Sequence, residues 1–137
     1  MEKPFKDDYR YLATYHSEQF DIWFDKDNYP GECYRYLAMY CYEHFDIWFD
    51  KNIFPKKDYK YLTMRCSEYF DIWFDKDNYP REYYKYLAMY CSEYFDVWFD
   101  NSIFPKDKYY YLSKYCLEYY QIWELDAKNR IRRINKL

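Results

Sequence analysis

Apolar side chains recur along this chain at the spacing of one face of an α-helix. In a representative segment they occupy positions i, i+3, i+4 and i+7, as Tyr34, Leu37, Ala38 and Cys41. This spacing predicts a helix from about Pro30 to Cys41. A β-strand is the alternative, because aromatic residues favour strands, but YLAMYC lacks the alternation of polar and apolar residues that a half-buried strand shows.

The same pattern returns every 25 residues. Four near-identical repeats and a diverged fifth span 9–33, 34–58, 59–83, 84–108 and 109–133. Their linkers alternate between a KDNYP type and an IFPK type, which indicates that the block 9–58 was duplicated into 59–108. A fixed period of this length is typical of solenoids.

Each repeat is predicted to hold a long helix and a short helical segment. Proline suits the first turn of a helix, so Pro30 marks its start, with Asn28 or Tyr29 as the cap. The short segment covers about 42–49 and is expected to be partly a 3₁₀-helix, with Phe45, Trp48 and Phe49 on one face. In three repeats a serine precedes the first glutamate of this segment and is predicted to be its N-cap: Ser17, Ser67 and Ser92.

The predicted fold is therefore a single all-α domain over 1–137, a right-handed α-solenoid of five repeats. An N-terminal cap covers 1–8, with a helix start at Pro4, and the diverged repeat plus a capping helix covers 109–137. Four apolar residues predict a longer terminal helix that closes the stack: Ile122, Leu125, Ile131 and Ile134. Atypical end repeats are expected, because an open end exposes apolar surface.

The succession of LAMYC and SEYFDIWFD resembles the leucine-rich-repeat-variant arrays of the α-solenoid group, relatives in shape of HEAT repeats. The resemblance covers nearly the whole chain. Aromatic rings stand here where that family has aliphatic residues, and the proline-rich start of the short segment is missing. The resemblance implies the architecture and a binding scaffold, and it brings no catalytic residue with it.

Composition shows which side chains must fill the core. Aromatic residues make up 28% of the chain, and Tyr alone contributes 23 residues, so rings fill the interior. Five cysteines are present, and four of them recur at a spacing of 25. Equivalent positions in stacked repeats lie too far apart for a disulfide, and together with the odd count this predicts free thiols.

Targeting and catalytic signals are weak. The start lacks an apolar signal region and no apolar run is long enough for a membrane span, so a cytoplasmic protein without membrane contact is expected. The DKDN stretch resembles the start of a calcium loop but lacks its glycine and closing glutamate. With two histidines, one glycine and no assembled nucleophile and base, the expectation is a protein without enzymatic activity, cofactor or metal.

Carboxylates are the strongest candidates for function. One glutamate and two aspartates recur at i, i+3 and i+7 in each of four repeats. On a helix they would share the face opposite the rings and align between repeats. The predicted binding residues are Glu43, Asp46, Asp50, Glu68, Asp71, Asp75, Glu93, Asp96 and Asp100. The alternative is a solvated face neutralised by nearby cations: Arg10, Arg35, Lys60, Lys85, Lys26, Lys51 and Lys76.

Positions that vary between repeats add candidate specificity residues. One such position holds Gln19, His44, Tyr69, Tyr94 and Tyr119, of which His44, Tyr69 and Tyr94 are predicted to bind. A second holds Gly31, Lys56, Arg81 and Lys106. Exposed tyrosines favour protein interfaces, and the alternative for the extra tyrosines is packing between repeats.

Charge narrows the class of partner. Residues 127–137 carry five basic groups and no acid. Since the net charge of the whole chain is −3, residues 1–126 carry a net charge of −8. The acidic body disfavours direct nucleic-acid binding, because phosphates would be repelled. We expect a monomeric scaffold that binds a protein with a basic surface. Two alternatives are an inhibitor whose carboxylates mimic phosphates in a nucleic-acid site of its target and a self-assembling structural array.

Overall fold

The computed structural model describes residues 6–136 and the side chains from residue 8 onward. All regular structure in this part of the chain is helical, in pairs of a longer and a shorter helix that recur every 25 residues. This confirms the predicted α-solenoid of helical repeats. The chain divides into two compact units, Met1–Pro80 and Arg81–Leu137. The predicted start at Pro4 and most of the cap over 1–8 lie outside the described residues.

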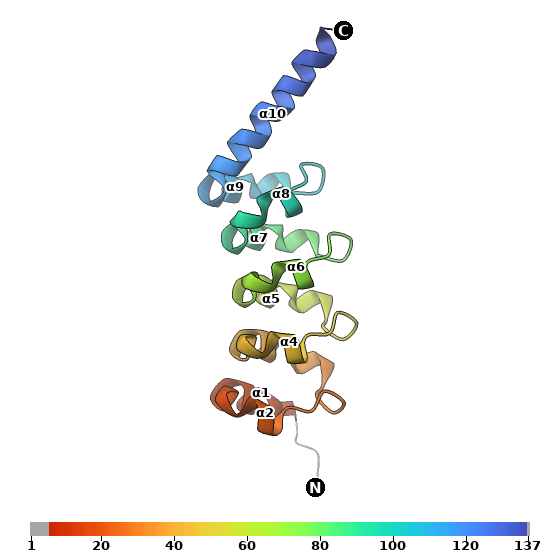
Figure 1. The fold of residues 1–137 in the computed structure, drawn as a ribbon, viewed down its shortest axis with the longest axis vertical. Helices are drawn as coiled ribbons and strands as arrows, with labels where there is room; N and C mark the ends of the chain where they lie inside the picture. The colour runs from red at the N-terminus through yellow and green to blue at the C-terminus, as the bar shows by residue number, and fades with distance from the viewer. Residues whose placement is uncertain (1–5, 137) are drawn as a thin grey trace. The chain divides into compact units, whose positions relative to one another are not determined.

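The first unit holds three repeats, each with a long and a short α-helix. The longer helices α1, α3 and α5 pack on one another in chain order, as Figure 1 shows. The α-helices are α1 (Lys6–Tyr15), α2 (Phe20–Trp23), α3 (Tyr34–Tyr40), α4 (Phe45–Trp48), α5 (Tyr59–Arg65) and α6 (Phe70–Trp73). A 3₁₀-helix leads into each of the last five: η1 (Ser17–Gln19), η2 (Gly31–Cys33), η3 (Tyr42–His44), η4 (Lys56–Asp58) and η5 (Ser67–Tyr69).

The second unit holds the fourth repeat and the diverged fifth. Its helices are η6 (Arg81–Tyr83), α7 (Tyr84–Tyr90), η7 (Ser92–Tyr94), α8 (Phe95–Trp98), η8 (Lys106–Lys108), α9 (Tyr109–Tyr115) and α10 (Leu117–Asn135). Helix α9 packs against α7 on one side and α10 on the other. None of the helices in the described part of the chain is both long and apolar enough to cross a membrane.

A buried tryptophan fixes the junction between the two helices of a repeat. The chain leaves the long helix at Cys41, where φ is −120° and ψ is 31°, so the Cys41 carbonyl cannot continue the helical pattern. Instead it accepts hydrogen bonds from the His44 amide at 3.0 Å and from the Trp48 indole N–H at 2.8 Å. The same indole bond joins Trp73 to Cys66 and Trp98 to Cys91. These three rings have no exposed surface. Each buried side chain therefore both packs the junction and supplies the hydrogen-bond donor that the cysteine carbonyl lacks.

Within each unit, cysteines connect a repeat to the one before it. The Cys41 thiol donates to the Ala13 carbonyl and the Cys66 thiol to the Ala38 carbonyl, both at 3.8 Å. In the second unit the Cys116 thiol donates to the Ala88 carbonyl at 3.4 Å. All five cysteines are buried and none forms a disulfide, which confirms the prediction of free thiols.

The helix starts differ from the predicted caps. Helices α3 and α5 follow 3₁₀ turns that begin after Pro30 and Pro55, so the prolines themselves occupy the N-cap positions. Ser17 and Ser67 are the first residues of η1 and η5 and make no capping bond. The predicted N-caps at Asn28 or Tyr29 and at Ser17, Ser67 and Ser92 were therefore wrong. From α2 to α9 a tight 3₁₀ turn precedes each helix and satisfies early N–H groups through backbone bonds instead.

Helix α10 is longer than the short helices, as predicted, but different residues hold it in place. Ile122, Leu125, Ile131 and Ile134 were expected to close the stack, and they are 62%, 58%, 58% and 65% exposed. The contacts come instead from two half-buried rings, since Trp123 meets Phe99 at 5.0 Å and Tyr120 meets Tyr109 at 6.3 Å. The apolar residues that the sequence suggested as a cap face solvent.

Candidate functional site

The first two carboxylates of each repeat lie on the exposed side of the short helix. Glu43 and Glu68 occupy the first turns of η3 and η5, and Asp46 and Asp71 occupy the first turns of α4 and α6. Their side chains are exposed. In the second unit Glu93 and Asp96 hold the same positions in η7 and α8. Acidic residues at a helix start are favourable because of the helix dipole, so this placement is locally stable without any partner.

The third carboxylate of each repeat does not lie on that helix, contrary to the prediction. Helix α4 ends at Trp48, and Phe49 is extended, with φ −69° and ψ 129°. Asp50 therefore begins the following turn, where it accepts the Asn52 amide at 2.9 Å. Asp75 and Asp100 do the same in their own turns. These aspartates shape the linker and are not part of a continuous carboxylate stripe.

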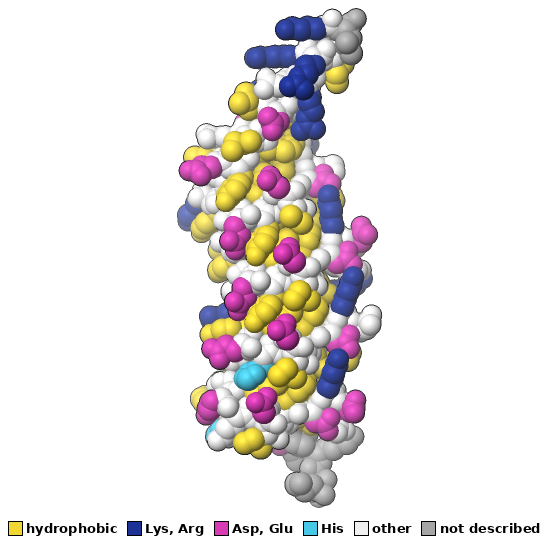
Figure 2. All heavy atoms as spheres, viewed as in Figure 1, with side chains coloured by type: hydrophobic (Ala, Val, Ile, Leu, Met, Phe, Trp, Pro, Cys, Tyr) yellow, Lys and Arg dark blue, Asp and Glu magenta, His cyan; other side chains and the backbone are white. Residues whose placement is uncertain are grey.

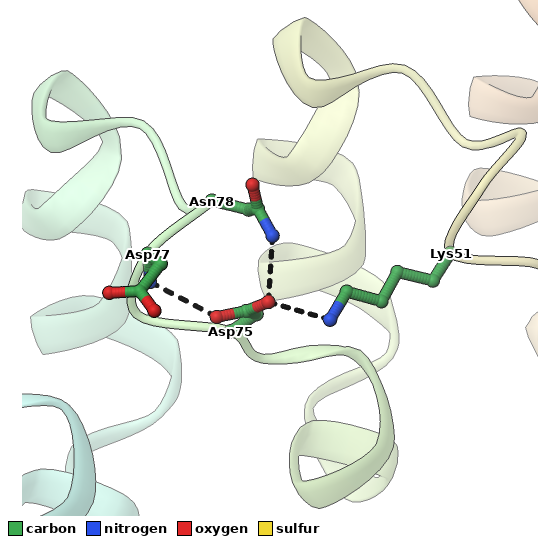
Figure 3. A network of polar contacts seen from close by, with 4 residues as sticks. All are labelled: Lys51, Asp75, Asp77 and Asn78. Atoms are coloured by element: carbon green, nitrogen blue, oxygen red, sulfur yellow. Dashed lines mark hydrogen bonds and ion pairs between the residues drawn. The ribbon is translucent and has the colours of Figure 1, made fainter.

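Figure 3 shows the contacts of Asp75. Its oxygens accept the Asp77 amide at 3.1 Å, the Asn78 side-chain amide at 2.7 Å and the Lys51 ammonium at 2.6 Å. The bond from Lys51, followed by those from Asn78 and Asp77, lowers the pKa of Asp75. Lys26 reaches Asp50 in the same way, at 3.1 Å. Each lysine thus joins its linker to the linker of the next repeat.

Two of the cations that were expected to neutralise the carboxylates, Lys26 and Lys51, do so at Asp50 and Asp75, whereas cations on the long helices lie beside tyrosine rings. The guanidinium of Arg35 lies 5.6 Å from the Tyr36 ring, and Lys60 lies 5.3 Å from the Tyr61 ring. In the second unit Lys85 lies 5.1 Å from Tyr86. These are cation–π distances. Among the described side chains of the first unit, Glu43, Asp46, Glu68 and Asp71 form no ion pair.

Ring stacking brings the short helices of successive repeats together. His44 stacks on Phe20 and Tyr69 stacks on Phe45, each at 4.4 Å between ring centroids. Burial raises the pKa of Tyr69, and the charges of Glu68 and of two carboxylates from the preceding repeat, Asp46 and Glu43, add to this. The carboxylates of neighbouring repeats therefore share one local electrostatic environment.

The side chains at the variable position of His44, Tyr69, Tyr94 and Tyr119 contribute to packing within the array. His44 and Tyr69 are half-buried, and Tyr119 stacks on Phe95 at 5.9 Å in the second unit. Tyr94 is half-buried as well. That His44, Tyr69 and Tyr94 contact a partner stays a prediction.

Sequence reasoning missed an apolar residue that accompanies the carboxylates. Ile22, Ile47 and Ile72 are 83%, 54% and 56% exposed, each directly after the aspartate of its short helix. Val97 and Ile122 hold this position in the second unit, at 57% and 62%. Figure 2 shows acidic side chains recurring within each unit with apolar side chains between them. The signal was present in the sequence, as a β-branched residue at one fixed position of all five repeats.

We call Glu43, Asp46, Ile47, Glu68, Asp71 and Ile72, with Glu18, Asp21 and Ile22, the acidic–isoleucine surface of the first unit. A hollow of about 160 Å³ lies beside it and is lined in part by Glu18, Glu43 and His44. The hollow is large enough for part of one side chain, and two carboxylates border it. The surface therefore offers unpaired negative charge, exposed apolar area and a small acidic recess.

Chemically reactive groups are few near this surface. Burial raises the pKa of the Cys41 and Cys66 thiols to about 12, so they stay protonated near neutral pH. Among the residues whose side chains are described, no three of His, Cys, Asp or Glu are grouped closely enough to hold a metal ion. The arrangement suits contact with another molecule through charge and apolar area.

Comparison with known proteins gives no further identification. No protein-family model, no curated protein and no solved structure matches this chain. The repeat geometry and the composition of its exposed surfaces are therefore the basis for any functional conclusion.

Proposed function

We propose that this chain is a non-enzymatic repeat scaffold that binds another protein through the acidic–isoleucine surface. The observation that carries the proposal is the recurrence of an exposed isoleucine beside unpaired carboxylates in three successive repeats of the first unit. Single exposed apolar residues are normal on protein surfaces. A row of aliphatic side chains at one repeat position, each more than half exposed, supports an interaction surface.

The charges suggest the chemistry of the partner. Carboxylates without ion pairs attract Lys and Arg and raise the association rate of a basic surface. The recess between Glu18 and Glu43 suits an inserted basic side chain. The isoleucines favour a partner with apolar side chains between its cations. The partner we propose is a protein with a basic surface interrupted by apolar positions, and direct binding of nucleic acid is disfavoured because phosphates would be repelled.

The exposed isoleucines count against the alternative that the surface mimics phosphates. A surface that copied only phosphates would gain little from an apolar residue in each repeat. Competition can separate the two possibilities, because duplex DNA displaces a mimic from the nucleic-acid site of its target and leaves a different interface intact. We favour the general protein scaffold, and DNA competition is one arm of its test.

The test compares capture of protein from a cell extract by the full chain and by variants of the surface. Ile47→Ser with Ile72→Ser removes apolar contact, and Asp46→Asn with Asp71→Asn removes charge. Asp27→Asn with Asp77→Asn is the matched control, because both aspartates are exposed in linkers and the charge change is the same. Interface hot spots contribute more than about 1–2 kcal/mol each, so each surface variant should lower affinity for a captured partner at least about tenfold.

Two readouts decide the outcome. Partner binding should weaken with salt for the unmodified chain, and this dependence should shrink in the Asp46→Asn, Asp71→Asn variant. The linker control should capture partners as the unmodified chain does. Equal capture of every partner by the isoleucine variant, the aspartate variant and the control would exclude this surface.

A further inference from the structure

The second unit contains a cleft unrelated to the acidic–isoleucine surface. Its volume is about 840 Å³, within the range of small-molecule sites. It lies between η6 and α7 on one side and, on the other, the linker after α8 together with η8. Ten residues line it: Arg81, Glu82, Lys85, Asn101, Ser102, Phe104, Pro105, Lys106, Asp107 and Lys108.

Positive charge dominates the lining of this cleft. Four of the ten residues are cations and two are carboxylates, so the net charge is +2. The Asp107 carboxylate reaches Lys108 only at 3.9 Å and is 78% exposed, so it neutralises Lys108 weakly. The buried Phe104 ring and Pro105 supply apolar area. Cations thus converge on a partly apolar cleft in a protein whose body is otherwise acidic.

The corresponding ten positions of the first unit carry the same net charge in a different arrangement, because Lys51 stands where the second unit has Asn101 and Lys57 where it has Asp107. Arg35 and Asp58 correspond to Lys85 and Lys108, at a distance of two repeat periods. Asp58 is only 3% exposed, and one of its carboxylate oxygens has no hydrogen-bond partner. Burial raises its pKa, and the charge of nearby Arg35 acts in the opposite direction. An internal carboxylate thus faces the cation there, whereas the second unit has Lys108 in its place.

A further substitution strengthens the contrast. The variable position that holds Gly31 just before α3 holds Arg81 just before α7. Gly31 contributes no side chain beyond the backbone, while Arg81 is exposed at the edge of the cleft. An arginine fork can hold two oxygens of one phosphate at once. The second unit therefore lacks the buried carboxylate of the first, carries its acid at the exposed Asp107 instead, and has an added arginine.

We propose that this cleft binds a small polyanion that carries at least two phosphate groups. Four cations around one cleft exceed what a single phosphate needs, and the volume leaves room for a diphosphate with an attached group. Charge-assisted hydrogen bonds are stronger than neutral ones, so several of them around one cleft favour a ligand with several negative charges. The diphosphate can be free or part of a nucleotide, and the two sources are separable by experiment.

The experiment titrates the full chain with pyrophosphate in one arm and with ADP in the other, by calorimetry at low ionic strength. Backbone amide NMR shifts of Arg81, Lys85, Ser102 and Lys106 report the position of binding. Saturable binding of pyrophosphate with shifts confined to the cleft supports the proposal. Tighter binding of ADP than of pyrophosphate identifies a nucleotide as the source, and equal or weaker binding of ADP identifies the free diphosphate.

Two matched pairs of variants make the proposal falsifiable. Lys108→Asp places a carboxylate at the position that Asp58 holds in the first unit and should weaken binding at least tenfold, whereas Lys128→Asp on α10 makes the same charge change outside the cleft. Lys106→Ala should weaken binding, while Lys56→Ala, its counterpart in the first unit, should not. Circular dichroism checks that each variant keeps its helices. Absence of saturable binding, or equal weakening by Lys108→Asp and Lys128→Asp, would overturn the proposal.

Discussion

Replacing Trp73 with alanine is expected to lower the free energy of unfolding by about 3–5 kcal/mol. The Trp73 ring is fully buried, so its removal leaves a large cavity at the junction of α5 and α6. Its indole N–H also donates to the Cys66 carbonyl at 2.7 Å. A loss of this size is a large part of the stability of a typical domain. Urea unfolding followed by circular dichroism measures it.

Two comparison variants separate packing from hydrogen bonding. Trp73→Phe keeps most of the ring and loses the donor, and since the Tyr69 amide still donates to Cys66 at 3.0 Å, the cost should be nearer about 1 kcal/mol. Trp123→Ala removes a half-buried ring of α10 and should cost less than Trp73→Ala. A smaller effect at Trp73 than at Trp123 would contradict the role of the buried junction.

Stability is expected to fall steeply between about pH 9 and pH 11 because of the buried thiols. Burial raises the pKa of Cys41, Cys66 and Cys91 to about 12 and that of Cys116 to about 11. In the unfolded chain the thiols ionise near their ordinary pKa of about 8.5. Below that pH both states are protonated, so the stabilisation is complete at pH 7 and is lost as the pH rises toward the folded pKa. Each thiol then costs about 1.4 kcal/mol per pH unit.

Four thiols that titrate in the same direction can remove stability comparable to that of the whole fold. The measurement is the urea midpoint as a function of pH. The variant Cys66→Ala, Cys91→Ala has two thiols fewer and should show about half the slope between about pH 9 and pH 10. Above that range buried tyrosines such as Tyr29 and Tyr34, whose pKa burial also raises, add to the loss in both proteins. A midpoint that stays level up to pH 11, or an equal slope in the variant, would show that the thiols do not control alkaline unfolding.

The helices were predictable because their signals are local and repeated. Tyr34, Leu37 and Ala38 lie on the buried face of α3, as their spacing predicted. The short helix began with a 3₁₀ turn as expected, and Trp48 is buried at the junction. A period of 25 residues repeats each of these signals several times, so a misleading residue in one repeat is outweighed by the others.

The candidate surface was only half predictable. Helical spacing placed Asp50 on the face of Glu43 and Asp46, but a change in ψ at Phe49 ends the helix before it. Such a change depends on how Phe49 packs against Phe45 and Phe54, at 4.7 Å and 6.2 Å, which spacing along the chain does not reveal. The exposure of Ile47 was missed for a related reason, because apolar residues in an amphipathic segment are assumed to lie inside.

The bond that runs from Cys41, Cys66 and Cys116 to a carbonyl 28 residues earlier has an evolutionary consequence. These repeats pack on the backbone of the repeat before them. The block 9–58 resembles the block 59–108 closely, so either block offers the next repeat a similar packing surface. Unequal recombination could therefore add or delete a whole 50-residue block and leave the contacts between the remaining repeats unchanged. Descendants of such a gene would differ in length by multiples of 50 residues. They would therefore differ in how many repeats present an exposed surface to a partner.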